Sequence, residues 1–188
     1  MLFRSCGTIN GHDYVDLGLP SGLLWATCNV GATSPSDNGG YYAWDEVITK
    51  DRYDKNNYNT TGKQMNCIAG DSTYDIARKE WGGNWRLPTK AEFQELIDNC
   101  KFEFITVNRI KGYKVTSMNN GKSMFLPTAG WCFGDMYYKQ RHYGRYRSAT
   151  LDESDSLRAY YLNCYDDFID ICKSYCHDGL CVRPVASK

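Results

Sequence analysis

Four residues near the C-terminus carry side chains that can bind metals or take part in redox chemistry: Cys172, Cys176, His177 and Cys181. Thiolate and imidazole groups are the usual ligands of structural zinc sites. The spacing C-x3-C-H-x3-C matches no common zinc motif, and two adjacent residues of an extended chain point to opposite sides. We therefore expect no metal and no other cofactor at this cluster.

The pair Cys172 and Cys176 also raises the question of a cysteine-dependent enzyme. A reactive cysteine needs a stabilised thiolate, for which the neighbouring His177 is weak evidence. The other histidines, His12 and His142, are too dispersed for a catalytic triad, and the sequence has no Gly-x-Ser-x-Gly motif and no phosphate-binding glycine loop. We therefore predict that the protein is not an enzyme.

Two acidic groups offer oxygen ligands, residues 152–155 and residues 166–167. Calcium binds carboxylate oxygens, but its binding loops place ligands in an alternating order that neither group shows. We expect solvated acidic turns at both places, and calcium binding is left open.

Most of the last fifty residues have a composition typical of molecular recognition. An apolar skeleton alternates there with tyrosine, arginine, histidine and small polar residues. Tyrosine offers a large amphipathic contact area at low entropic cost, and small polar residues adapt their hydrogen bonds to a ligand. We predict these ligand-binding residues: Tyr137, Tyr138, Arg141, His142, Tyr143, Arg145, Arg147, Tyr165, Phe168, Asp170, Cys172, Ser174, Tyr175, Cys176, His177, Asp178 and Cys181.

The length of 188 residues fits a single domain with its own core. We divide it into a scaffold, residues 1–133, and a ligand-binding region, residues 134–185. The formal net charge is zero, so nothing favours nucleic acid or an anionic membrane as a partner. No apolar run approaches the ~18 residues of a membrane span, and the first residues lack the apolar segment of a signal peptide. The nine cysteines are irregularly spaced, which indicates mostly free thiols and leaves one disulfide in the tail open.

Two helices are predicted in the scaffold. The first begins at Ser72–Asp75 and stops at Gly82. The second begins at Thr89, which forms a capping box with Glu92. Its apolar residues follow at the spacing of one helix face: Phe93, Leu96, Ile97 and Cys100.

Alternating apolar and polar residues predict short strands. Residues 14–19 and 23–26 form two strands across a turn, and residues 113–118 and 122–127 form a hairpin across Asn120-Gly121.

Two further strands are predicted in the tail, over residues 159–165 and 168–172. In the second, Ile169 and Ile171 point inward, whereas Phe168, Asp170 and Cys172 point outward. The resulting class is α+β, with two helices packed on short antiparallel strands and with long loops.

Five phrases of the sequence together resemble one family. They are Gly11–Ala26, Asn38–Trp44, Trp81–Thr89, Phe125–Gly130 and Gly179–Val185. The chain resembles the paralogous surface and phage domains of gut bacteria that share the formylglycine-generating-enzyme type of C-type lectin fold, from about residue 11 to residue 185. The resemblance implies a C-type-lectin-like domain whose terminal strands return beside the N-terminal strands.

Within that family the tail resembles the variable region of a diversity-generating-retroelement target protein. In such systems randomised AAC-type codons become codons that cannot encode Lys, Gln, Glu, Met or Trp. Between Asn163 and Cys181 the sequence holds one residue of these types, Lys173, which we interpret as a fixed position. The phrase Tyr146–Thr150 has Arg147 where the family has tryptophan. Either Arg147 belongs to the diversified set, or the local packing differs.

The resemblance implies a non-enzymatic receptor-recognition protein whose partner is a protein or glycan on a host or target cell. It places the protein at a phage tail tip or on a bacterial surface, and leaves homo-oligomerisation open. Two alternatives remain. One is a cysteine-dependent oxidase like the formylglycine-generating enzymes, although three residues separate Cys172 from Cys176 where that family has four. The other is a structural surface domain without a diversified site.

Overall fold

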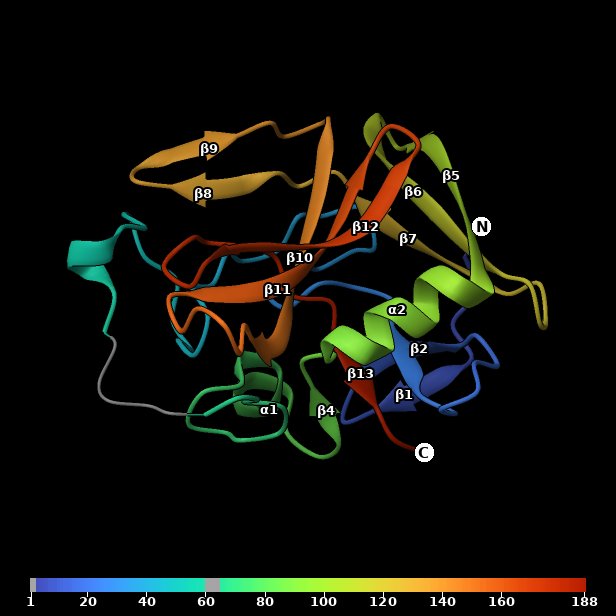
Figure 1. Cartoon of the computed structure of the whole chain (residues 1–188). Coiled ribbons are helices and arrows are strands. Elements are labelled where there is room, and N and C mark those ends of the chain that lie inside the picture. Colours follow the sequence, from blue (N-terminus) through green and yellow to red (C-terminus); the bar gives the residue numbers. More distant parts are fainter. Residues whose placement is uncertain (1–2, 60–64) are drawn as a thin grey trace.

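The computed structural model describes residues 3–59 and 65–188 and has a mostly-β architecture, with two short helices and several antiparallel sheets (Figure 1). The expected α+β class holds in its elements but overstates the helical part, because the two α-helices have only six and ten residues. Neither helix of the described residues is long and apolar enough to cross a membrane.

A five-stranded sheet joins the two ends of the chain. Its strands, in spatial order, are β1 (Gly7–Ile9), β2 (His12–Asp16), β3 (Leu24–Ala26), β13 (Val185–Ala186) and β4 (Trp85–Arg86). Val185 lies opposite Trp25 on one side and Arg86 on the other. The expected return of the C-terminus beside the N-terminal strands is therefore observed.

Both predicted helices are present. Helix α1 (Ile76–Trp81) begins at Asp75, whose buried carboxylate accepts hydrogen bonds from four backbone N–H groups, those of residues 70, 77, 78 and 87. It ends at Gly82, where φ is 65°. Helix α2 (Lys90–Asn99) begins with the expected capping box of Thr89 and Glu92. A short 3-10 turn spans Lys55–Asn57.

The predicted hairpin is part of a three-stranded sheet, β5 (Cys100–Val107), β6 (Ile110–Ser117) and β7 (Ser123–Pro127). A separate two-stranded hairpin follows, β8 (Trp131–Phe133) and β9 (Met136–Tyr138), which our sequence analysis did not anticipate. In Figure 1 the β8–β9 hairpin extends at one end of the molecule, beside the last large sheet.

That last sheet contains most of the predicted binding residues. Its strands are β10 (Tyr143–Leu151), β11 (Arg158–Tyr165) and β12 (Phe168–Tyr175), in that spatial order. One face packs on α2 and the core through residues such as Tyr146, Leu162 and Ile171. The alternation of strand side chains therefore turns the other residues of the three strands away from the core.

A buried arginine fixes the tail to the scaffold. The Arg183 guanidinium donates to Asn29 Oδ1 at 2.8 Å and to the carbonyl oxygens of Ala26, Thr27 and Phe125 at 2.7–3.0 Å. These bonds connect β3, the loop that follows it and β7 to the last residues of the chain. The last residues of the chain are thus tied to three segments of the scaffold.

Candidate ligand-binding surface

The three tail strands present an ordered set of side chains on the face directed away from the core, which we call the outer face. Its residues form cross-strand rows. The rows are Tyr143–Tyr165–Phe168, Arg145–Asn163–Asp170 and Arg147–Tyr161–Cys172, with Ser174 beyond them. The predicted outward direction of Phe168, Asp170 and Cys172 agrees with this register. Neighbours in a row lie ~5 Å apart, close enough to act together.

Aromatic rings form a continuous chain that begins on the outer face and ends at Tyr175, which by the register of β12 shares the side of Lys173. Tyr143 stacks on Tyr165 with ring centroids 4.0 Å apart and 4° between the planes. Trp131 of β8 contacts Tyr143 at 5.8 Å and stacks on Tyr138 at 5.7 Å. The chain continues through Phe133, which lies 6.5 Å from Tyr138 and 6.1 Å from His177, to Tyr175, which stacks on His177 at 5.0 Å. The β8–β9 hairpin therefore joins the outer face to the turn that follows β12.

Arg145 lies at the centre of this aromatic chain. Its guanidinium carbon is 3.5 Å from the centroid of the Trp131 ring and 5.1 Å from that of Tyr161. A cation over aromatic rings gains about 0.5–2 kcal/mol, depending on its desolvation. Arg145 Nε and Asn163 Oδ1 are buried and have no hydrogen-bond partner within the described chain. Two polar atoms of one cross-strand row are thus left unsatisfied beneath the surface.

Twelve of the predicted binding residues are exposed or partly exposed. Three large aromatic residues stand out, with exposed fractions of 73% for Phe168, 59% for Tyr137 and 43% for Tyr175. The other nine are Tyr138, Arg141, His142, Tyr143, Arg145, Tyr165, Asp170, Cys172 and His177. Arg141 and His142 lie in the connection between β9 and β10, and both are exposed.

Five predicted binding residues are buried, which corrects the predicted set: Arg147, Ser174, Cys176, Asp178 and Cys181. The reason is the turn after β12, which folds back over the third row. Arg147 donates to Ser174 Oγ at 3.0 Å and to the carbonyl oxygen of Asp178 at 2.6 Å. The Arg147 side chain is therefore part of the local packing. All five residues belong to the framework beneath the surface.

Four further residues complete the site and were not predicted from the sequence: Trp131, Phe133 and Asn163 at the surface, and Tyr161 buried beneath it. Trp131 and Phe133 fell within the scaffold as we had divided it. The alternation of Trp131-x-Phe133 and Met136-x-Tyr138 about Gly134, where φ is 60°, was a detectable hairpin signal. Tyr161 and Asn163 lie four and two positions before Tyr165 in β11, so their side chains share its side of the strand. The predicted outward direction of Tyr165 therefore implied theirs as well.

The tail cysteines are free, and burial makes their thiols less acidic. All nine cysteines are free, and the described residues contain no group of three or more histidine, cysteine or acidic residues able to hold a metal ion. Burial raises the pKa of Cys172 above its ordinary value and that of Cys176 to about 11. Both thiols are therefore protonated near neutral pH, which is the opposite of what a nucleophilic cysteine requires.

The first acidic group forms a local structure. Asp152 accepts a hydrogen bond from the Ser154 hydroxyl at 2.9 Å and pairs with Lys173 Nζ at 2.8 Å. The Lys173 hydrogen bond is the largest of the effects that lower the pKa of Asp152 to about 2. Lys173 alternates with the outer-face residues of β12 and so lies on the other side of the sheet.

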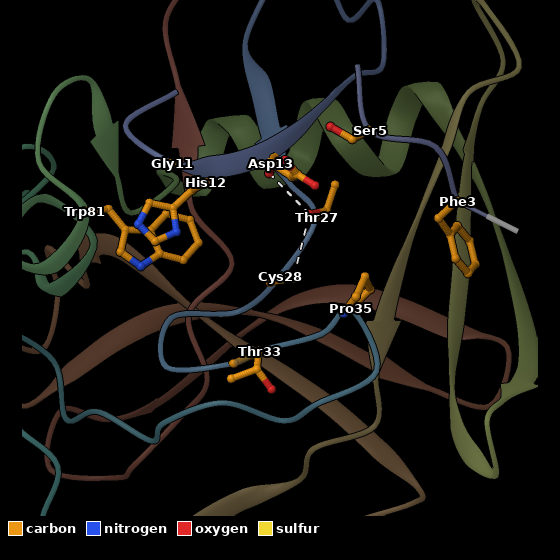
Figure 2. Close-up of a pocket in the computed structure, with 11 residues that line it drawn as sticks. Phe3, Ser5, Gly11, His12, Asp13, Thr27, Cys28, Thr33, Pro35 and Trp81 are labelled. Carbon is orange, nitrogen blue, oxygen red and sulfur yellow. Dashed lines mark hydrogen bonds between the residues drawn. The ribbon is translucent and has the colours of Figure 1, made fainter. Parts of the chain in front are cut away.

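A pocket of about 360 Å³ lies elsewhere, between the β1–β2 turn, residues 27–35 and the end of α1. Figure 2 shows His12 lying flat on Trp81, with ring centroids 3.8 Å apart. Thr27 Oγ1 donates to the Asp13 carbonyl oxygen at 3.3 Å. Because His12 occupies the face of Trp81, the ring is not free to stack on a ligand.

Comparisons of the chain with protein-family models, with curated proteins and with solved structures found no match. Function is therefore inferred from the geometry of the surface. That geometry offers aromatic contact area, an unpaired cation and mixed hydrogen-bonding groups, all held on strands. Such an arrangement is typical of surfaces that recognise a partner.

Proposed function

We propose that the chain is a non-enzymatic binding protein that recognises a partner through the outer face of β10–β12 and the β8–β9 hairpin. The observation that carries the proposal is the continuous chain of rings from Tyr165 to Tyr175, with Arg145 at its centre. Aromatic residues and arginine dominate the binding energy of protein interfaces. Strands hold these side chains in place, which lowers the entropy lost on binding.

We further propose a C-type-lectin-like fold of the formylglycine-generating-enzyme type, with a tail diversified by a retroelement. The pairing of β13 with β3 supports the fold. The division of side chains in β12 supports diversification, because Phe168, Asp170 and Cys172 lie on the outer face while Lys173 pairs with Asp152 on the other side. Exposed residues of the outer face, such as Phe168 and Asp170, can change without disturbing the core, as diversification requires.

The proposed setting is a phage tail tip or a bacterial surface, where the partner is a molecule on another cell. Assembly of several copies would multiply weak contacts into useful avidity. The cysteine-dependent oxidase is disfavoured by the raised pKa values of Cys172 and Cys176. A structural domain without a binding site is disfavoured by the exposure of Phe168 and Tyr137, since exposed aromatic clusters mark interaction sites.

The proposal is tested by applying the labelled protein to an array of bacterial surface proteins and glycans. Three versions are compared: the wild type, Phe168→Asp on the outer face, and Met118→Asp as a matched control. Met118 is also an exposed apolar residue, but it lies in the β6–β7 turn beside Asn99. We expect specific spots that persist with Met118→Asp and disappear with Phe168→Asp. Array spots that bind Phe168→Asp as strongly as they bind the wild type would refute binding through this face.

A further inference from the structure

Arg145 differs from Arg86, Arg147 and Arg183 in that no nitrogen of its side chain forms a hydrogen bond or an ion pair with a described residue, whereas Arg147 donates to Ser174 and Asp178. Arg86 pairs with Glu92 at 2.6 Å, and Arg183 donates to an amide and three carbonyl oxygens. None of the ion pairs formed by the described residues includes Arg145. Arg145 therefore has no salt bridge with the described residues in its partly buried position, and its charge acts at longer range, where it opposes the rise in the pKa of Asp178 that burial causes.

The position of this charge is fixed before any ligand arrives. The guanidinium lies in contact with the Trp131 ring and is flanked by the Tyr161 and Tyr143 rings at 5.1 Å and 5.6 Å. Tyr161 is itself buried, so part of this enclosure belongs to the rigid framework. An arginine held in this way loses little side-chain freedom on forming its next contact.

We propose that Arg145 is the central anchor of the surface and that it binds a carboxylate side chain of a protein partner; this inference rests on the proposed function. The planar guanidinium matches a carboxylate through two parallel hydrogen bonds. Asn163, its neighbour in the row, has a buried oxygen, Oδ1, without a hydrogen-bond partner among the described residues, so the polar environment of Arg145 is not saturated within the chain.

Charge and composition favour a protein over a polyanion such as a sulfated glycan. Asp170 lies in the same row as Arg145, and residues 166–167 add two acidic side chains at the β11–β12 turn. A polyanion crossing the face would meet these carboxylates, and like charges in contact oppose binding. Phe133, Met136 and Phe168 are large, apolar and exposed around the site. They fit apolar side chains surrounding one acidic residue.

The inference is tested with a displayed library of random cyclic peptides, selected on the whole chain. The peptides to be analysed are those that bind the wild-type protein and do not bind the Phe168→Asp variant. We expect them to contain Asp or Glu, and Arg145→Met to weaken their binding about 30-fold, the size of a hot-spot loss. Changing the acidic residue of the peptide to its amide should weaken binding to the wild type by a similar factor and have little effect with Arg145→Met.

Controls separate charge, shape and folding. Arg145→Lys keeps the charge without the planar fork and should restore only part of the affinity. Arg4→Met removes an exposed arginine that precedes β1 and should change nothing. Thermal unfolding of each variant shows that the chain is folded. A sulfated oligosaccharide and inorganic phosphate are titrated as competing anions, with the Arg145 Nε–H followed by NMR.

The outcomes distinguish a failure of the proposed role of Arg145 from a failure of the proposed function. Peptides that depend on Phe168 but not on Arg145, or that lack acidic residues, would overturn the role of Arg145 and leave binding through the outer face intact. The same role is overturned if the oligosaccharide or phosphate binds at Arg145 while acidic peptides do not. A selection that yields no Phe168-dependent peptide would contradict the proposed function and this inference together.

Discussion

Tyr143 and Tyr165 lie ring on ring across β10 and β11, with centroids 4.0 Å apart and planes only 4° from parallel. They are also directly opposite each other in the strand register. The stack closes one end of the outer face and supports the contact of Tyr143 with Trp131. The pair therefore has a role in stability that is separate from its role in binding.

We predict that the two rings are energetically coupled. In a double-mutant cycle with Tyr143→Ala and Tyr165→Ala, the losses in the free energy of unfolding should depart from additivity by about 0.5–1.5 kcal/mol, the value typical of aromatic pairs. Urea denaturation of the four proteins measures this coupling. Strictly additive losses would mean that the stack contributes nothing beyond the burial of each ring.

Arg145 and Arg147 provide a matched pair of residues, two positions apart on the same strand face. Arg147 is fully buried and donates to Ser174, Tyr175 and Asp178. Removing a buried charged donor leaves its acceptors unpaired, so Arg147→Ala should lower the free energy of unfolding by about 3 kcal/mol. Arg145→Ala should lower it by less than about 1 kcal/mol.

The effect of these two substitutions on binding should be the reverse of their effect on stability, with Arg145→Ala causing the larger loss. Arg145→Ala is expected to abolish the contacts found on the array while the protein stays folded at the assay temperature. Urea denaturation and the array together check this separation. Equal destabilisation by the two changes would show that Arg145 belongs to the framework, and would remove the basis for its role as an anchor.

The stability of the protein should fall in mild acid, in part because of His177. Burial lowers the pKa of this residue below 6.5, an effect larger than the opposing attraction of Asp178. The unfolded chain therefore binds a proton first as the pH falls. The contribution of neutral His177 is fully present above pH 6.5 and is lost as the pH falls from there toward the lowered pKa of the folded state.

The measurement compares the free energy of unfolding at about pH 7.5 and about pH 5.5 for the wild type and His177→Gln. The wild type should lose more stability over this interval than the variant. His142→Gln, at an exposed position, serves as the control and should behave as the wild type does. An identical loss in the wild type and in His177→Gln would show that His177 titrates alike in the folded and unfolded chain.

The cysteines should divide into two reactivity classes. Cys6 and Cys67 are exposed and should react with a thiol reagent in the native protein. Burial raises the pKa of Cys100 and Cys132 to about 12, so these thiols should react only as the chain unfolds. Titration in denaturant without reductant should find all nine thiols. A smaller number would reveal a disulfide, and rapid native labelling of Cys176 would favour the oxidase alternative.

The sequence predicted those parts of the fold that depend on local signals. The capping box at Thr89 and the Asn120-Gly121 turn are set by neighbouring residues, and both elements lie where we expected them. The alternation of Phe168, Asp170 and Cys172 likewise gave the correct outward side of β12. Periodicity was sufficient there because the core defines one face of the strand.

Burial at the end of the tail could not be predicted in the same way. Arg147 and Asp178 are separated by thirty-one positions and meet because the turn after β12 folds back over the sheet. Arginine and aspartate are rarely buried without a partner, so their types indicated a surface. Trp131 was missed for the converse reason, since tryptophan is most often a core residue. Its neighbour in space, Arg145, is identified only by the structure.

The most direct test of a diversified recognition surface is the variation of this gene within one phage or bacterial population, together with a search of the flanking DNA for a near-copy of the tail that differs at adenines. We expect substitutions to concentrate at the codons of Tyr143, Arg145, Phe168 and Asp170, and to spare those of buried or paired residues such as Arg147, Lys173, Cys176 and Cys181. Substitutions spread equally over both groups, with no such copy nearby, would contradict the account.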